Sequence, residues 1–527
     1  GIIFKIAQAA MDQLGGGRGG SAAHISGIEN GDGKPAPGRI ACNAGTVYAG
    51  ADDGKIERLG GQVHKCFPNG VCRHRKGDMT DQLILVLDAG TTSTRAIAFT
   101  TTGEIVASAG RPMTQHYPAS GWVEHDPAEI RDLSQACLEE VAAAVGAERI
   151  AAIGITNQRE TICFWDRTTG EPLARAIVWQ DRRTADYCAG LKAADPGLEA
   201  RVQAKTGLLL DPYFSGTKFR WALDNWPMVA DAARDGRLAV GTVESWLIWN
   251  LSGGTRHVTD ATNASRTLLL ALDGAQFDEG LCELFGVPRA ALPEVVDCAG
   301  EFGTTAPGLF DAPLAIRGLA GDQQAATVGQ VCFAPGEAKN TYGTGNFLLL
   351  NTGEDLVRSS NGLLTTVAYQ FGDAKPVYAL EGSIAVTGSA VQWLRDGMGL
   401  IGKASEMDGL AKRADAQQQV YLVPAFTGLG APYWDAEARG ALYGLTRDTG
   451  IKEVVTAGLL SVCYQTRDLV EAIRGDGATL DSLRVDGGMA NNDWVMQKLA
   501  DVLGCDVQRP TLVETTALGA AFMASLQ

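Results

Sequence analysis

The chain has 527 residues, of which 45% are hydrophobic and 20% charged, so it is too long for a single core and too apolar for a disordered protein. Its 61 acidic and 45 basic residues give a net charge of -16, which argues against binding to nucleic acid. No apolar run approaches the roughly 18 residues of a bilayer span, and eleven scattered cysteines with no secretory leader ahead of them favour reduced thiols in a cytoplasm.

The first 78 residues differ from the rest of the chain. They contain 17 glycines and little apolar periodicity, so we expect a disordered or non-native leader, with the natural start at Met79. Cys66, Cys72 and His74 suggest a metal site, but a fourth ligand at a suitable spacing is missing and basic residues surround them. We therefore disfavour that site.

From residue 83 onward, strand and helix patterns alternate. The aliphatic run 83–87 predicts a strand buried on both faces, and strands at 96–99 and 104–108 complete a meander. Asp126 and Pro127 predict the start of a helix that ends at Gly146, and a strand at 150–155 follows. These elements indicate a mixed α/β domain.

A second passage has the same plan. Residues 338–342 and 347–350 predict two strands joined by Gly343-Thr344-Gly345, as residues 88–99 join two strands through a Gly/Thr-rich turn. This repetition predicts two related halves, 79–331 and 332–527, that face one another across a cleft.

The first of these turns has the chemistry of a phosphate site. Successive backbone N–H groups and the hydroxyls of Thr91, Thr92 and Ser93 are suited to phosphate oxygens, and Asp88 offers a carboxylate to Mg²⁺. The alternative is a plain hairpin capped by Asp88. The second turn favours the phosphate interpretation.

Two further segments carry candidate chemistry. Arg159 and Glu160 follow a buried strand and offer donors and acceptors to adjacent hydroxyls, although a surface ion pair is the alternative. Asp322 follows the small residues 318–321, so its carboxylate can approach a ligand and take a proton from a hydroxyl. Its alternative role is to cap a helix that begins at Gln323.

Seven motifs in order resemble the FGGY carbohydrate kinases, which belong to the sugar-kinase, heat-shock and actin superfamily. They are DAGTTSTR (88–95), NQRE (157–160), VWQDRR (178–183), DPYFSGTK (211–218), GDQQAA (321–326), NTYGTGNF (340–347) and VDGGMANND (485–493). The resemblance runs from about residue 83 to the end. It implies an α/β fold of two actin-like, ribonuclease H-like domains, each with a mixed sheet flanked by helices, around a central cleft.

The resemblance also implies an activity, namely ATP- and Mg²⁺-dependent phosphorylation of a polyol. The motifs are most similar to those of the family members that convert glycerol to sn-glycerol 3-phosphate. A family member that acts on a pentulose or gluconate is the alternative, and a non-catalytic nucleotide clamp is a rival from another class. A homo-oligomer, either a dimer or a tetramer, is expected.

Site roles follow from the resemblance position by position. The residues expected to bind the acceptor are Arg159, Glu160, Trp179, Tyr213, Asp322, Gln323 and Phe347, with Asp322 as the catalytic base. Those expected to bind the nucleotide are Thr91, Thr92, Ser93, Arg95, Thr344, Gly388, Gln392, Gly488 and Asn492. Asp88 and Asp322 are the expected Mg²⁺ ligands. Residues 381–384, together with Gly388, Ser389 and Gln392, are expected to form a further wall of the nucleotide site.

The end of the chain departs from the family pattern. Residues 516–527 predict a helix that stops without Gly, Asn or Pro. We therefore expect the C-terminal domain to lack a terminal segment that its relatives have.

Overall fold

A computed structural model describes residues 40–42, 65–66, 72–73, 82–372 and 374–526. Three short strands come from the first 78 residues, namely β1 (Ile40–Cys42), β2 (Lys65–Cys66) and β3 (Cys72–Arg73). The remaining residues of the expected leader, with His74 of the disfavoured metal site among them, lie outside the described part of the chain. Met79, the expected start, also lies outside it.

The first large sheet is built around the predicted meander. Its strand order is β16-β8-β4-β5-β6, continued by β3 and β2. The strands β16, β8 and β4 are parallel, whereas β4, β5 and β6 are antiparallel. The main strands are β4 (Leu83–Ala89), β5 (Ser93–Thr100), β6 (Ile105–Pro112), β8 (Ile150–Asn157) and β16 (Ile316–Gly321).

The helix expected after Asp126 is present as α2 (Pro127–Val145). The Asp126 carboxylate accepts a hydrogen bond from the backbone N–H of Ala128, and Gly146 ends the helix. Its apolar side packs against β4, β5 and β6, because Ile130, Leu138 and Val141 are buried there. The local signals therefore specified this element correctly.

The second large sheet repeats the plan of the first. Its order is β1-β24-β23-β17-β18-β20-β19, with β1, β24, β23 and β17 parallel and the remaining pairs antiparallel. The predicted repetition is thus confirmed in the direction of the strands, while the order differs at one place, because β20 rather than β19 lies next to β18. The strands are β17 (Glu337–Tyr342), β18 (Asn346–Gly353), β19 (Leu364–Tyr369), β20 (Val377–Ile384), β23 (Ser482–Asp486) and β24 (Val507–Arg509).

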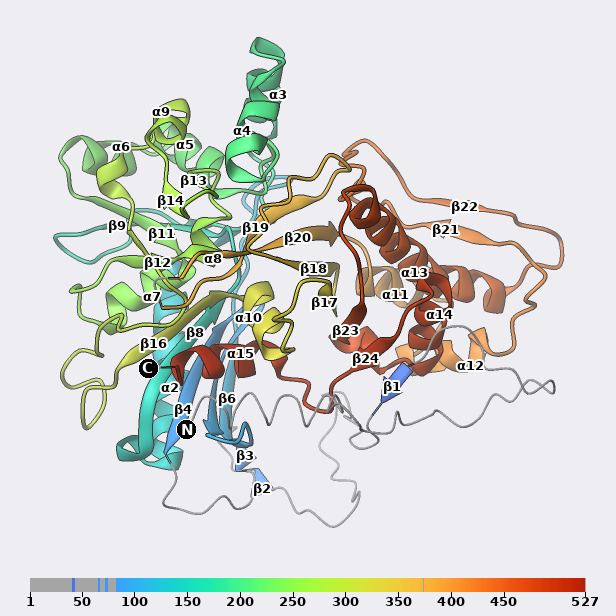
Figure 1. Cartoon of the computed structure of the whole chain (residues 1–527), viewed down its shortest axis with the longest axis horizontal. Coiled ribbons are helices and arrows are strands. Elements are labelled where there is room, and N and C mark those ends of the chain that lie inside the picture. Colours follow the sequence, from blue (N-terminus) through green and yellow to red (C-terminus); the bar gives the residue numbers. More distant parts are fainter. Residues whose placement is uncertain (1–39, 43–64, 67–71, 74–81, 373, 527) are drawn as a thin grey trace.

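Two helices pack against each other between the sheets, α10 (Asp322–Gly329) and α15 (Thr515–Ala524) (Figure 1). The contact depends on glycine, because a Cβ at Gly329 would lie 1.9 Å from the carbonyl oxygen of Thr515, and one at Gly519 would lie 1.8 Å from that of Ala325. Helix α15 also lies on β8 and β16 of the first sheet. A helix late in the sequence therefore completes the core of the first half.

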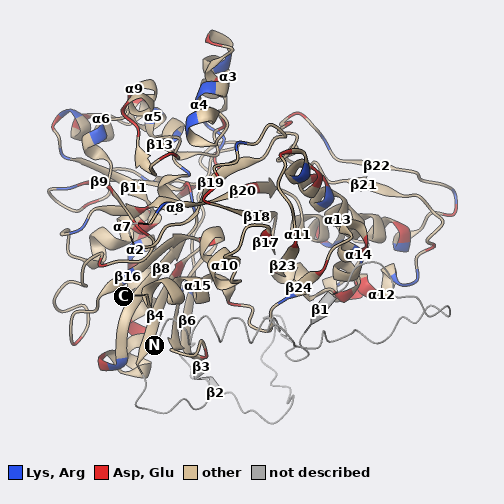
Figure 2. Ribbon diagram, in the orientation of Figure 1, with Lys and Arg blue, Asp and Glu red and all other residues tan. Residues whose placement is uncertain are grey.

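Charged residues lie mainly on the outer helices and loops (Figure 2). Smaller elements complete the two halves. Those of the first half are β7 (Glu124–His125), β9 (Ile162–Asp166), β10 (Ala176–Ile177), α3 (Ala185–Ala194), α4 (Leu198–Thr206), α5 (Ser215–Asn225), α6 (Pro227–Arg234), β11 (Leu238–Thr242), α7 (Val243–Leu251), β12 (Val258–Asp260), α8 (Ala261–Ala264), β13 (Leu270–Ala271), β14 (Gln276–Phe277), α9 (Glu279–Phe285) and β15 (Glu294–Val296). Those of the second half are α11 (Gly388–Gln392), α12 (Met407–Ala411), β21 (Tyr421–Val423), β22 (Ala441–Tyr443), α13 (Ile451–Gly475) and α14 (Asp493–Leu503).

None of the helices in the described ranges is both long enough and apolar enough to cross a membrane. The cysteines whose side chains are described are free thiols.

Candidate functional site

The candidate residues of the first half meet at one edge of its sheet. Strands β4, β8 and β16 are parallel, so their carboxyl ends share that edge. Asp88 lies near the end of β4, Arg159 and Glu160 follow β8, and Asp322 follows β16. In the register of the sheet Asp88 is opposite Thr156, which is in turn opposite Ala320. Ligand sites of α/β sheets form at such edges.

Arg159 and Glu160 are buried rather than at the surface, with 3% and 1% of their area exposed, so the surface ion pair is excluded. The Arg159 guanidinium donates two hydrogen bonds to the Glu381 carboxylate, at 2.7 and 2.9 Å. Its Nε lies 3.5 Å from Oδ1 of Asp322. Glu160 accepts a 2.6 Å hydrogen bond from Nε of Arg266.

The backbone of Glu160 has a φ of 60°, which is unusual for a residue with a side chain. Its carbonyl oxygen accepts hydrogen bonds from the Ser215 hydroxyl at 3.0 Å and from Nζ of Lys218 at 3.4 Å. Lys218 also donates to the carbonyl of Tyr213 at 2.7 Å. Burial lowers the pKa of Lys218 to about 8. One buried lysine thus fixes two of the predicted acceptor-binding segments.

Three aromatic rings form a partly exposed wall. The Trp179 ring lies 5.8 Å from Tyr213 and 6.1 Å from Phe347, measured between centroids, in edge-on geometry. The indole N–H of Trp179 donates to the Thr91 hydroxyl at 2.9 Å. Trp179 therefore contacts both the turn between β4 and β5, through Thr91, and the start of β18, through Phe347.

Asp322 is the first residue of α10, and its side chain is 31% exposed. Its Oδ1 accepts a hydrogen bond from the backbone N–H of Gln323, while Gly321 occupies the capping position without a side-chain bond. Burial raises the pKa of Asp322 to about 6, although Arg159 opposes the shift. A carboxyl group with this pKa can accept a proton near neutral pH.

Gln323 is buried beside Asp322 and accepts a hydrogen bond from the ammonium group of Lys339. Lys339 also donates to the Thr341 hydroxyl at 3.0 Å and has no exposed area. Burial lowers its pKa to about 8. A residue of the second half therefore supports a predicted acceptor-binding residue of the first.

The predicted nucleotide residues of the second half gather at the carboxyl edge of its sheet. The turn at Gly343 and Thr344 accepts backbone hydrogen bonds from Thr387, Gly388 and Ser389, at 2.9 to 3.1 Å. Gly487 follows β23 with a φ of 87°, and a Cβ there would lie 2.4 Å from the carbonyl oxygen of Tyr342. The exposed members of this group are Thr344, Gln392 and Gly488.

Asn492 has a structural contact of its own. Its side-chain oxygen accepts a 3.0 Å hydrogen bond from the backbone N–H of Val495, so it caps α14. The helix start that it caps lies next to Gly488, which opens a short 3₁₀ turn.

In the turn after β4, Asp88 and Arg95 are cross-strand neighbours and form a 2.6 Å ion pair. Arg95 also pairs with Glu514 at 2.9 Å. Thr92 is exposed, whereas Thr91 and Ser93 are half-buried. The carboxylate expected to bind a metal is thus neutralised by the arginine expected to bind the nucleotide.

One expectation is wrong. Glu381 does not form a wall of the nucleotide site, because its carboxylate is fully buried and paired with Arg159 and Arg266. Burial tends to raise its pKa, but the two arginines outweigh this effect and hold the pKa at about 2.

Sequence reasoning missed three residues that touch the predicted site, Lys218, Arg266 and Lys339, and it assigned a fourth, Glu381, to the wrong part of the site. Each is a charged residue inside a segment whose neighbours are buried. That pattern was a usable signal for Lys218 and Lys339, which lie inside or next to recognised motifs. The pairing of Arg266 with Glu381 joins residues 115 positions apart and has no local signal.

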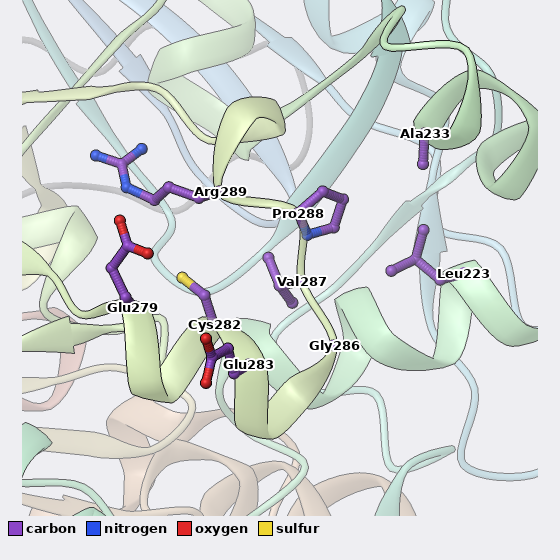
Figure 3. Close-up of a pocket in the computed structure, with 9 residues that line it drawn as sticks. All are labelled: Leu223, Ala233, Glu279, Cys282, Glu283, Gly286, Val287, Pro288 and Arg289. Carbon is purple, nitrogen blue, oxygen red and sulfur yellow. The ribbon is translucent and has the colours of Figure 1, made fainter.

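A cavity of about 510 Å³ lies elsewhere, between α5, α6 and α9 (Figure 3). None of the predicted site residues lines it. Within the described part of the chain, no group of three or more His, Cys, Asp or Glu side chains is arranged to hold a metal ion.

Fold and site together define a class of protein. Two α/β domains of one plan place buried polar side chains and a carboxyl group with raised pKa at the carboxyl ends of their sheets, where glycine-rich turns also lie.

Comparison with known proteins specifies the family. Residues 83–329 match the N-terminal domain, and residues 338–527 the C-terminal domain, of the FGGY family of carbohydrate kinases. The chain belongs to this family.

Similar proteins include glycerol kinase of Ectopseudomonas mendocina, 59% identical over 84% of this chain and 90% of that protein. Glycerol kinase 1 of Pseudomonas aeruginosa is also 59% identical, with the same coverage. Among solved structures, Plasmodium falciparum glycerol kinase with ADP has a TM-score of 0.80 at 39% identity, covering 85% of this chain and 89% of that one. Xylulose kinase of Lactobacillus acidophilus has a TM-score of 0.77 at 22% identity, over 84% and 89% of the two chains, and shows the shared fold.

Proposed function

We propose that the protein transfers the γ-phosphoryl group of ATP to a terminal hydroxyl of glycerol and forms sn-glycerol 3-phosphate. The observation that carries the proposal is a continuous set of contacts in a chain 59% identical to glycerol kinases. Arg159 lies beside both Asp322 and Glu160, and Arg266 joins Glu160 to Tyr213, which packs against Trp179. The ADP in the similar Plasmodium structure supports ATP as the donor.

The residues divide the work between the halves. Arg159, Glu160 and Gln323 offer hydrogen bonds to the acceptor hydroxyls, while Tyr213, Trp179 and Phe347 cover its carbon chain. Asp322 orients the reacting hydroxyl and takes its proton as the new O–P bond forms and the bond to ADP breaks. The turns at 90–92 and 343–345 and the residues Gly388, Gln392, Gly488 and Asn492 hold the nucleotide.

We also propose Mg²⁺ as the accompanying ion. Asp88 and Asp322 supply the oxygen ligands that Mg²⁺ prefers, and one or two carboxylates suffice when phosphate oxygens and water complete the shell. When bound, the ion neutralises charge on the phosphates. Asp88 already forms a 2.6 Å ion pair with Arg95, whereas the nearest arginine nitrogen to Asp322 is 3.5 Å away. Asp322 is therefore the more available of the two carboxylates for a metal ion.

The acceptor is expected to be small. The ring of Trp179 lies about 6 Å from those of Tyr213 and Phe347. Arg266, which lies near the Tyr213 ring, is already hydrogen-bonded to Glu160. A five-carbon sugar needs additional hydroxyl partners. A pentulose or gluconate is therefore the less favoured acceptor.

Purified protein tests the proposal directly. With ATP and Mg²⁺, ADP release should follow glycerol addition and should be at least about tenfold slower with xylulose or gluconate at equal concentration. ADP release without dependence on any acceptor would instead support the nucleotide clamp. Light scattering of the same sample tests our further proposal that the protein is a dimer or tetramer, and cell fractionation tests a cytoplasmic location.

A further inference from the structure

Four charged side chains form a buried cluster at the junction of the two halves. We call Arg159, Glu160, Arg266 and Glu381 the Arg–Glu cluster, and each has at most 3% of its area exposed. Two positive and two negative charges balance. Only Arg159 and Glu160 belong to a recognised acceptor motif.

Arg266 contacts three parts of this cluster and its surroundings. Its Nε donates to Glu160 at 2.6 Å, and its Nη2 donates to Glu381 at 3.1 Å. The guanidinium also lies 5.7 Å from the ring centre of Tyr213. Arg266 thus touches two side chains that bind the acceptor in our proposal.

Glu381 reaches the cluster from the other half. It lies in β20 of the second sheet, and its two oxygens accept a pair of hydrogen bonds from Arg159, which follows β8 of the first. Such a two-point contact fixes the plane of a guanidinium. Arg159 in turn approaches Asp322 through its Nε, at 3.5 Å.

Stability alone is a poor explanation for this cluster. Removing four charges from water carries a large desolvation cost, and well-packed apolar side chains often serve a core equally well or better. The geometry suits the positioning of the acceptor motif. Arg159 is hydrogen-bonded to Glu381 and Glu160 to Arg266, and both of these partners lie outside the motif.

We infer that Arg266 and Glu381 are positioning residues of the acceptor site, which hold Arg159, Glu160 and Tyr213 in the arrangement that binds a polyol. Acceptor affinity then depends on the docking of β20 against the first half. This inference rests on the proposed function, since it assumes that the motif residues contact glycerol.

The test compares Glu381→Gln and Arg266→Lys with a matched control, Tyr378→Phe. Tyr378 also lies on β20 and donates a buried 2.8 Å hydrogen bond to the carbonyl of Leu272 in the first half, but it does not touch the cluster. We expect each cluster variant to raise the KM for glycerol by about 10-fold or more, as for loss of a charged hydrogen bond. The KM for ATP should change by less than about twofold, and Tyr378→Phe should leave both constants unchanged.

A double variant separates positioning from folding. Arg266→Gln combined with Glu381→Gln keeps the cluster neutral, so its unfolding midpoint should exceed that of Glu381→Gln, while its KM for glycerol stays high. Recovery of both properties together would show a purely structural role and overturn the inference.

The remaining outcomes are equally decisive. A folded Glu381→Gln protein with the parental KM for glycerol refutes the inference but leaves the proposed function intact. Equal rises in KM for glycerol and ATP would show a general loss of domain docking, which also refutes it. A parental protein that does not phosphorylate glycerol refutes the proposed function itself, and the inference with it.

Discussion

The carboxyl group of Asp322 is partly exposed, and its pKa is raised above the ordinary value. Burial lifts its pKa to about 6, and the nearby Arg159 limits the rise. A neutral isostere keeps the shape of the side chain but removes the proton acceptor.

We expect Asp322→Asn to lower kcat with glycerol by about 10²- to 10⁴-fold, the usual contribution of a positioned base. Affinity for ADP without Mg²⁺ should persist, since the nucleotide residues of the second half lie on other elements. Steady-state kinetics and ADP binding measure the two effects. Glu279→Gln, in the first turn of α9, serves as the control, and near-parental turnover by Asp322→Asn would remove this residue from the mechanism.

Glu381 makes the stability of the protein depend on pH in the acid range. Arg159 and Arg266 overcome the effect of burial and hold its pKa at about 2, below its ordinary 4.5. Because the folded state favours the ionised form, this group stabilises the fold above about pH 4.5, and the contribution disappears as the pH falls toward 2.

The parental protein should therefore lose more unfolding free energy between pH 5 and pH 3 than Glu381→Gln does. Urea unfolding at several pH values gives the two slopes. Equal slopes would mean that Glu381 is not ionised against its arginines.

At the scale of elements, the strand-turn junction after β23 is a tight contact. Gly487 has a φ of 87°, and a Cβ there would collide with the carbonyl of Tyr342 on the neighbouring strand. A side chain at this position displaces the Gly488 turn from β17.

Gly487→Ala should raise the KM for ATP by about tenfold, or about 1.4 kcal/mol, because the collision with Tyr342 displaces the turn, with little change in the KM for glycerol. Gly477→Ala is the matched control, because Gly477 has a φ of 81° but open space around its Cβ position. It carries the same conformational cost without the collision. An unchanged KM for ATP in Gly487→Ala would separate this turn from nucleotide binding.

Elements with continuous local signals were predictable from the sequence. The aliphatic run of β4 and the capped start of α2 each followed from residues close in the chain, and the second Gly/Thr turn was found by its likeness to the first. The Arg–Glu cluster was not predictable, because its members come from segments separated by long stretches of sequence. Glu381 was misplaced for this reason, since its neighbours in the chain lead to the nucleotide edge while its own side chain points to the other half.

At the scale of the whole molecule, α10 and α15 join the two sheets through close backbone contact. A methyl group at Gly519 would lie 1.8 Å from the carbonyl oxygen of Ala325, a position that no side chain can occupy without movement of a helix. Neither helix can rotate away without exposing apolar residues of the core between the sheets.

Gly519→Ala should therefore lower the unfolding free energy by about 3 kcal/mol or more, the upper range for overpacking in a core. Gly190→Ala in α3 is the opposite case, since nothing lies near its Cβ position and the change should stabilise the helix by about 0.5–1 kcal/mol. Urea unfolding of both proteins measures the contrast. A Gly519→Ala protein as stable as the parent would mean that the helices do not need this contact.

The place of α15 on β8 and β16 has a consequence for synthesis on the ribosome. The first sheet is translated early, yet one of its faces is covered by residues 515–524, which emerge last among the described elements. Until then its aliphatic surface stays open to chaperones and to other nascent chains. Completion of this core therefore has to wait until residues 515–524 have been translated, and the yield of folded protein depends on how long that face remains uncovered.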